Sequence, residues 1–98
     1  MNVTFHPDAR DDLDRVFDWI ARENPRAAHE MVVRIEAKVM QLAAPELAHM
    51  GRHGLVDGTR ELIEWPYIIV YRVREDHDEI VIASIVHGAQ DRSADEAY

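Results

Sequence analysis

The chain has 98 residues, 47% hydrophobic and 31% charged, which is the composition of one ordinary globular domain. Its formal net charge is −8, with 11 basic against 19 acidic residues and Lys38 as the only lysine, so binding along a nucleic-acid backbone is disfavoured. No apolar run approaches the roughly 20 residues of a membrane span, no export signal opens the chain and cysteine is absent, so we expect a cytoplasmic protein without disulfides.

The first residues predict a short strand that leads into a helix. Residues 2–6 alternate polar and apolar side chains, which places Val3 and Phe5 on the inner face. Pro7 suits the first turn of the helix, and the acids that follow it are favoured by the positive end of the helix dipole. Helical spacing then predicts one buried stripe, with Trp19 toward its edge: Ala9, Leu13, Val16, Phe17 and Ile20.

A second helix follows almost directly. Asn24 is a favoured cap and Pro25 a favoured first helical residue, so the link between the helices is short. The second apolar face consists of Ala28, Met31, Val32, Ile35, Val39 and Leu42. Two amphipathic helices joined so tightly pack as an antiparallel hairpin.

The second half of the chain reads as a long connection and three strands. Residues 44–58 contain glycines and a proline among polar residues, which is typical of a loop. The strands cover 58–65, 67–73 and 80–86; apolar residues on both faces of the last two indicate that both faces are covered. Pro66 interrupts the ladder, so Trp65 closes the first of these strands, and the short polar segment before residue 80 makes the last two antiparallel.

This order of elements predicts an α+β fold: a short N-terminal strand, an antiparallel helix hairpin and a three-stranded antiparallel meander. We expect a single domain over residues 1–98, with a flexible tail from about residue 91 because no apolar stripe follows there.

Three arginines of this half, Arg52, Arg60 and Arg72, are candidates for a binding surface. A guanidinium cluster beside a sheet can grip phosphate or carboxylate through its fork of donors. The same arginines can instead form structural ion pairs with the nearby acids Asp57, Glu61 and Glu64. The sequence leaves both interpretations open.

His87 follows the last strand, where an imidazole suits proton transfer but can also be a cap or an exposed side chain. The six histidines show no metal-ligand spacing, and no cofactor motif is present, so we expect neither a metal nor a cofactor. No nucleophile elbow, phosphate loop or paired-carboxylate pattern supports an enzymatic function.

The strings at residues 58–62, 67–73 and 86–92, GTREL, YIIVYRV and VHGAQDR, resemble the RelE/ParE superfamily of bacterial toxins. The opening pattern Ala9, Asp12-Leu13, Trp19-Ile20, Asn24-Pro25 and Ala27-Ala28, and the later Gly51-Arg52, extend the resemblance over nearly the whole chain. It implies the toxin of a type II toxin-antitoxin system, which inhibits growth, maintains a plasmid or chromosome, and is neutralised by a cognate antitoxin in a hetero-oligomer. A strand edge and the helix-hairpin groove are natural docking surfaces, with no antitoxin contact residue assigned.

Two activities divide this superfamily: RelE-like members cleave messenger RNA in the ribosome, and ParE-like members poison DNA gyrase. RelE-like nucleases typically follow the tyrosine of the central strand with an arginine, whereas this chain has Ile68. They also carry a basic residue and a tyrosine after the last strand, where Gln90, Asp91 and Glu96 stand here.

The ParE-like expectation is therefore a gyrase inhibitor rather than an enzyme, without direct contact to nucleic acid. Its target surface is expected to include Arg52, Arg60, Arg72, His87 and Gln90. Two alternatives remain: a RelE-like ribosome-dependent endonuclease, and a non-toxic antitoxin-binding module of the same fold.

Overall fold

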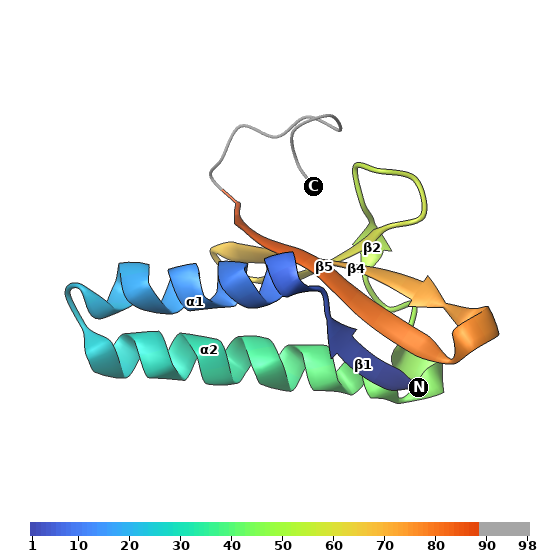
Figure 1. The fold of residues 1–98 in the computed structure, drawn as a ribbon, viewed down its shortest axis with the longest axis horizontal. Coiled ribbons are helices and arrows are strands. Elements are labelled where there is room, and N and C mark those ends of the chain that lie inside the picture. The colour runs from blue at the N-terminus through green and yellow to red at the C-terminus, as the bar shows by residue number, and fades with distance from the viewer. Residues whose placement is uncertain (89–98) are drawn as a thin grey trace.

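The computed structural model describes residues 1–88, which form a five-stranded sheet with two helices packed against one face (Figure 1). The strands lie in the order β1-β5-β4-β3-β2. Their bounds are β1 Asn2–Phe5, β2 Arg52–His53, β3 Arg60–Glu64, β4 Tyr67–Arg74 and β5 Glu79–His87. The expected α+β arrangement is confirmed, while the tail from residue 91 and Gln90 lie outside the described residues.

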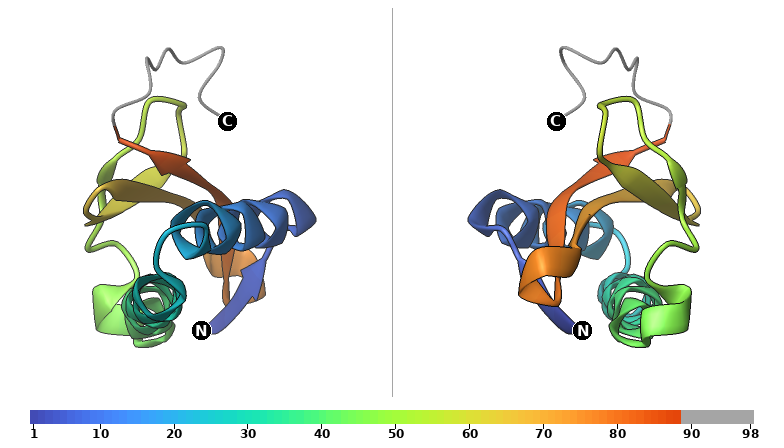
Figure 2. Two further views of the ribbon diagram at one scale, coloured as in Figure 1. Left: turned by 90° about the vertical axis from the view of Figure 1, so that its left-hand side faces the viewer. Right: turned by 90° about the vertical axis from the view of Figure 1, so that its right-hand side faces the viewer.

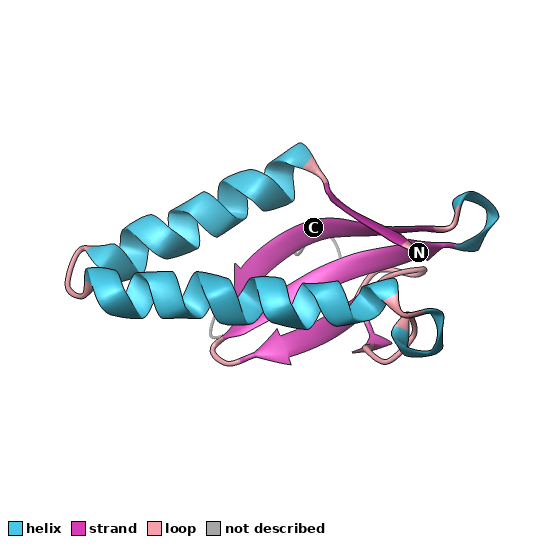
Figure 3. Cartoon of the chain, turned by 90° about the horizontal axis from the view of Figure 1, so that it is seen from below, coloured by secondary structure: helices cyan, strands magenta, loops and turns pink. Residues whose placement is uncertain are grey.

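The helices α1, Pro7–Ala21, and α2, Pro25–Met40, form the expected antiparallel hairpin (Figure 3). At the start of α1, His6 Nδ1 accepts the N–H of Asp8 at 3.1 Å. At the start of α2, Asn24 Oδ1 accepts the N–H of Ala27 at 3.1 Å. Both caps satisfy donors that a helix leaves unpaired at its first turn, which fixes where each helix begins.

The sheet is larger than the predicted meander and is mixed. β3, β4 and β5 are antiparallel neighbours as expected, but β1 pairs with β5 in parallel, with Val3 opposite Ile80. The long connection is also more ordered than a plain loop. It contains the 3-10 turn Pro45–Leu47 and the short β2, which adds an edge strand next to β3. The preceding 3-10 turn, Gln41–Ala43, replaces the end of the predicted second helix. In the end-on views the segment between β2 and β3 stands on the side of the sheet away from α2 (Figure 2).

The turn between β3 and β4 differs by one residue from the expectation. β3 ends at Glu64, so Trp65 belongs to the turn with Pro66 and is 73% exposed instead of closing the strand. The carbonyl of Pro66 accepts the N–H of Gly88 at 2.7 Å, which ties this turn to the end of β5. The end of β3, the start of β4 and the end of β5 therefore meet at the same end of the sheet.

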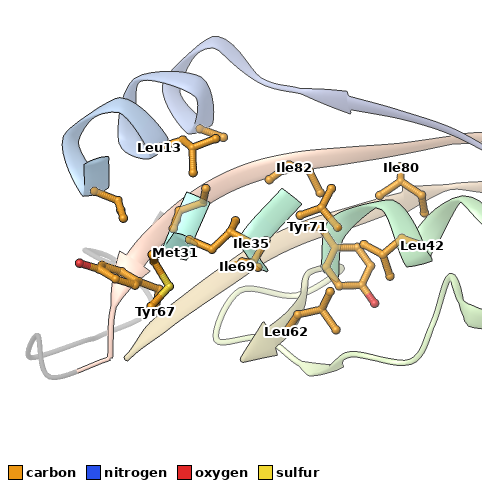
Figure 4. Packing of buried hydrophobic residues seen from close by; sticks show 14 of the residues in the cluster. Leu13, Met31, Ile35, Leu42, Leu62, Tyr67, Ile69, Tyr71, Ile80 and Ile82 are labelled. Atoms are coloured by element: carbon orange, nitrogen blue, oxygen red, sulfur yellow. The ribbon is translucent and has the colours of Figure 1, made fainter. Parts of the chain in front are cut away.

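The core fills the space between the helix hairpin and the sheet (Figure 4). Its largest fully buried side chains are Tyr71, Ile35, Leu42, Ile69, Ile80, Ile82 and Val39. The predicted helix stripes are confirmed at most positions. In α1, Phe17 is 38% exposed and Ile20 is half-buried, and in α2, Val32 is half-buried. Leu42 is buried as predicted but lies in the 3-10 turn that follows α2. Phe17 and Ile20 both lie toward the end of α1, where less of the sheet is available to cover the helix.

The opposite face of the sheet also carries buried residues. Ile68 and Val70 alternate along β4 with core residues, so they point away from the helices. They are only 5% and 0% exposed. The prediction that both faces of the central strands are covered is thus confirmed for this strand.

Candidate functional site

The segment before β2 and the loop between β2 and β3 are both fastened to the sheet by arginines. Arg60 Nη1 donates to the carbonyls of His49 at 3.0 Å and of Gly51 at 2.7 Å. Arg72 Nη1 donates to the carbonyl of Asp57 at 3.3 Å. These contacts go to backbone oxygens, which an arginine can bridge with its planar set of donors.

Arg52 has a different role, because it forms the structural ion pair that the sequence left open. Its Nε lies 3.0 Å from Glu61 Oε1, and Glu61 is only 3% exposed. The two residues are directly opposite each other on β2 and β3. A carboxylate this well buried needs a charged partner, so Arg52 stabilises the edge of the sheet.

Glu64 and Asp57, the other two acids considered as partners of these arginines, make different contacts. Glu64 is paired with α2 instead of with the loop arginines, at 3.6 Å from Arg34 Nε and 3.5 Å from Lys38 Nζ. Asp57 meets Arg72 through its backbone carbonyl and not through its carboxylate. Of the predicted ion pairs, the structure therefore contains the one between Arg52 and Glu61.

Tyr71 completes this arrangement from the core side. Its hydroxyl accepts the N–H of Gly51 at 3.0 Å. Burial raises the pKa of Tyr71, while the Gly51 hydrogen bond and the positive charge of Arg60 act in the opposite direction. Burial also raises the pKa of Tyr67 at the other end of β4. We call Arg52, Arg60, Arg72 and Tyr71 the loop clamp.

His87 does not join the loop clamp. It lies opposite Tyr67 in the β4–β5 register, and the two rings meet edge to face with centroids 5.4 Å apart. Arg60 lies opposite Tyr71, four residues farther along β4, which is a distance of roughly 13 Å along a strand. The structure thus divides the candidate residues into two sites, one at the start of β4 and one beside its second half, and Gln90 lies outside the described residues.

The site that contains His87 is an open groove of about 690 Å³ between α1 and the end of the sheet. Its floor is apolar and its rim is charged. Trp19 stands at the rim, 64% exposed, with the guanidinium carbon of Arg22 5.2 Å from its ring centroid. The groove is lined by Asp12, Arg15, Val16, Asp18, Trp19, Arg22, Tyr67, Ile85, Val86 and His87.

Asp12 joins the two walls of this groove, a role that the sequence reading missed. Its Oδ2 accepts the N–H of Ile85 at 3.0 Å, and its Oδ1 accepts a hydrogen bond from Arg15 at 2.9 Å. The sequence reading assigned the acids of this helix to its dipole. Asp12 lies in the second turn, where that interaction has already weakened, and this was the available signal for another role.

Two classes of site are not found in residues 1–88. No three histidine, aspartate or glutamate side chains of this part of the chain converge as metal ligands do. None of its helices combines the length and the apolar character needed to cross a membrane.

Comparison with known proteins places these sites in a family context. Residues 3–92 match the family described as "ParE toxin of type II toxin-antitoxin system, parDE". The chain is 38% identical over 80 residues to a Sinorhizobium fredii protein named "Putative toxin Y4kP", covering 80% of this chain and 78% of that protein.

Two solved structures share the fold. One, described as the chromosomal ParDE system from P. aeruginosa, superposes with a TM-score of 0.76 at 29% identity and covers 89% of this chain and 95% of that one. The other, the toxin-antitoxin complex RelBE2 from Mycobacterium tuberculosis, gives a TM-score of 0.63 at 22% identity and covers 88% and 95%. At that lower identity the second comparison shows the fold alone.

Proposed function

Because this chain belongs to the ParE toxin family of type II toxin-antitoxin systems, we propose that it inhibits DNA gyrase in the cytoplasm and is neutralised by a cognate antitoxin. The family membership makes it a toxin of the ParE/RelE superfamily. The choice of gyrase over messenger RNA rests on the residues described below.

Ile68 is the observation that carries this choice. It is the second residue of β4, where RelE-like nucleases typically have an arginine, and it is only 5% exposed. A buried aliphatic side chain offers neither a charge nor a hydrogen-bond donor to a phosphate. Phosphoryl chemistry relies on such donors to stabilise charge in the transition state.

The three arginines of the loop clamp also favour gyrase over messenger RNA as the target. Arg52, Arg60 and Arg72 are each engaged with the protein itself, which is a poor starting point for a ribonuclease clamp. The net charge of −8 also opposes docking onto ribosomal RNA. A protein surface such as that of gyrase makes no comparable demand for positive charge.

For the target we propose the edge of the sheet that carries Arg52, Arg60 and Arg72. The strand register directs Arg52 and Arg72 to the face away from the helices and Arg60 to the helix face. Arg72 is the best position at which to test this surface by substitution, because its side chain is exposed and makes a single long hydrogen bond of 3.3 Å. Gln90 stays a proposed target residue.

His87 shares the groove with Trp19, and for that site we propose the antitoxin. Amphipathic helices bind in apolar grooves of this kind with their apolar face inward. An exposed tryptophan at the rim is the type of side chain that contributes most to such interfaces.

The experiment measures supercoiling by purified gyrase with and without this protein, and adds the antitoxin encoded beside it afterwards. We expect supercoiling to fall, then to recover, while ribosome-bound messenger RNA stays intact. Arg72→Gln should weaken the inhibition, and Arg26→Gln, an exposed arginine of α2 far from the loop in sequence, should not.

Other outcomes identify the alternatives. Cleavage of messenger RNA in the ribosome with gyrase unaffected would make the protein a RelE-like endonuclease. Tight antitoxin binding with neither activity would make it a non-toxic binding module.

A further inference from the structure

A second, smaller pocket of about 210 Å³ lies beside the loop clamp, at the edge of the sheet. Half of its lining consists of one guanidinium and two imidazole side chains, which is unusual for a protein with a net charge of −8. The lining residues are His49, His53, Gly58, Thr59, Arg60 and Val73.

The strand register concentrates these side chains. His53 of β2 is directly opposite Arg60 of β3, so the two side chains leave the sheet on the same face. Residues in this relationship have Cβ atoms about 4.5–5.5 Å apart. An anion between the two side chains would accept hydrogen bonds from both of them.

Arg60 is held in place before any ligand arrives. Its Nη1 donates to the carbonyls of His49 and Gly51, at 3.0 and 2.7 Å, which fixes the guanidinium plane. Its Nε and Nη2 make no hydrogen bond to other residues of the described part of the chain. A fixed fork with donors to spare is the arrangement that recognises oxyanions.

The acidic groups nearby do not neutralise the positive charge of the Arg60 guanidinium. Glu75 Oε1 lies 3.1 Å from His49 Nε2, but the Glu75 side chain is 72% exposed and therefore well screened by water. Asp57 is exposed and meets Arg72 through its backbone carbonyl. The Thr59 hydroxyl donates to the carbonyl of Val56, so it supplies no donor to the pocket.

We propose that this pocket binds one oxyanion of phosphate size, held by the Arg60 guanidinium and flanked by the imidazoles of His49 and His53. The pocket is too small for a nucleotide and suits a single tetrahedral group. The source of that group is either free phosphate or a phosphomonoester. The proposal of an oxyanion site is independent of which target the toxin inhibits.

The test follows the histidine ring signals of the whole protein by NMR while inorganic phosphate is added, with chloride keeping the ionic strength constant. We expect saturable shifts of the His49 and His53 signals. His29 lies exposed on α2, away from the pocket, and serves as an internal control whose signals stay in place. A parallel titration with phosphoserine distinguishes the two sources, since tighter binding there identifies a phosphomonoester.

Two variants connect the signals to the pocket. Arg60→Gln should weaken phosphate binding about tenfold or more, as expected for loss of a charge-assisted hydrogen bond. Because Arg60 also holds the loop, His53→Ala provides a second variant that leaves those backbone contacts intact and should also weaken binding. Arg26→Gln should bind phosphate as the unmodified protein does.

The proposal is overturned if the His49 and His53 signals respond no more than those of His29. It is also overturned if Arg26→Gln weakens binding as much as Arg60→Gln, because the effect is then one of overall charge.

Discussion

The hydroxyl of Tyr71 accepts the backbone N–H of Gly51 at 3.0 Å, which joins the central strand to a loop that lies 20 residues earlier in the chain. Both residues are buried. A Cβ atom on Gly51 would come within 2.8 Å of the Tyr71 hydroxyl and 2.7 Å of the Glu61 carbonyl. Only glycine therefore allows the loop to approach the sheet this closely.

Replacing Tyr71 with phenylalanine should destabilise the protein by about 1–3 kcal/mol, because the buried N–H of Gly51 loses its acceptor. Chemical denaturation measures this change, and amide exchange at Gly51 should become faster. Tyr67→Phe is the control, since the Tyr67 hydroxyl has no hydrogen-bond partner within residues 1–88, and it should cost less. Equal losses in both variants would show that the hydrogen bond contributes nothing specific.

Stability should also fall at alkaline pH. Burial raises the pKa of Tyr67 and Tyr71 in the folded protein above the ordinary tyrosine value. This contribution is fully present below about pH 10, where unfolded tyrosine keeps its proton, and is lost as the pH rises through the higher folded pKa. The free energy of unfolding, measured between about pH 8 and pH 11, should decline at the upper end. Tyr71→Phe should decline less steeply, and an unchanged slope in that variant would contradict the assignment.

Ile35 is the best test of the helix packing. It is fully buried in the core, so Ile35→Ala should destabilise the protein by about 2–5 kcal/mol. Val33, on the same helix, is 48% exposed, and Val33→Ala should change the denaturation midpoint little. A midpoint for Ile35→Ala that matches the unmodified protein would mean that this face of α2 is not the packed one.

Trp19→Ala should weaken antitoxin binding by about 2 kcal/mol or more if the groove is the docking site, because a tryptophan that the partner covers buries a large apolar area. Trp65→Ala is the matched control: Trp65 is 73% exposed and does not line the groove. Calorimetry with the purified antitoxin measures both affinities. A loss confined to Trp65→Ala would move the docking site to the β3–β4 turn.

Local signals were enough to predict most of the fold. The cap at Asn24 depends on a side chain next to the helix that it begins, and the core stripe of α2 depends on spacing alone. The parallel pairing of β1 with β5 could not be read in this way. It joins Val3 to Ile80, and no local pattern specifies a contact between residues so far apart in the chain.

The candidate site was harder to predict for the same reason. The sequence singled out Arg60 and His87 by residue type, but the strand register places them four residues apart along β4, opposite Tyr71 and Tyr67. The groove was missed because its walls come from α1 and β5, and the link between them is the Asp12 carboxylate on the Ile85 amide. Residue type identifies candidates, whereas the register decides which of them meet.

The position of β5 has a consequence for how the protein is made. This strand is the last described element in the chain, yet it lies inside the sheet, between β1 and β4. During translation the helix hairpin can form from local contacts, while β1 and β4 lack their shared partner until β5 has been synthesised. A premature stop codon before residue 79 would leave both strands as open edges, which are prone to pair with other chains. Products truncated there should therefore be misfolded, and size-exclusion chromatography should find them aggregated.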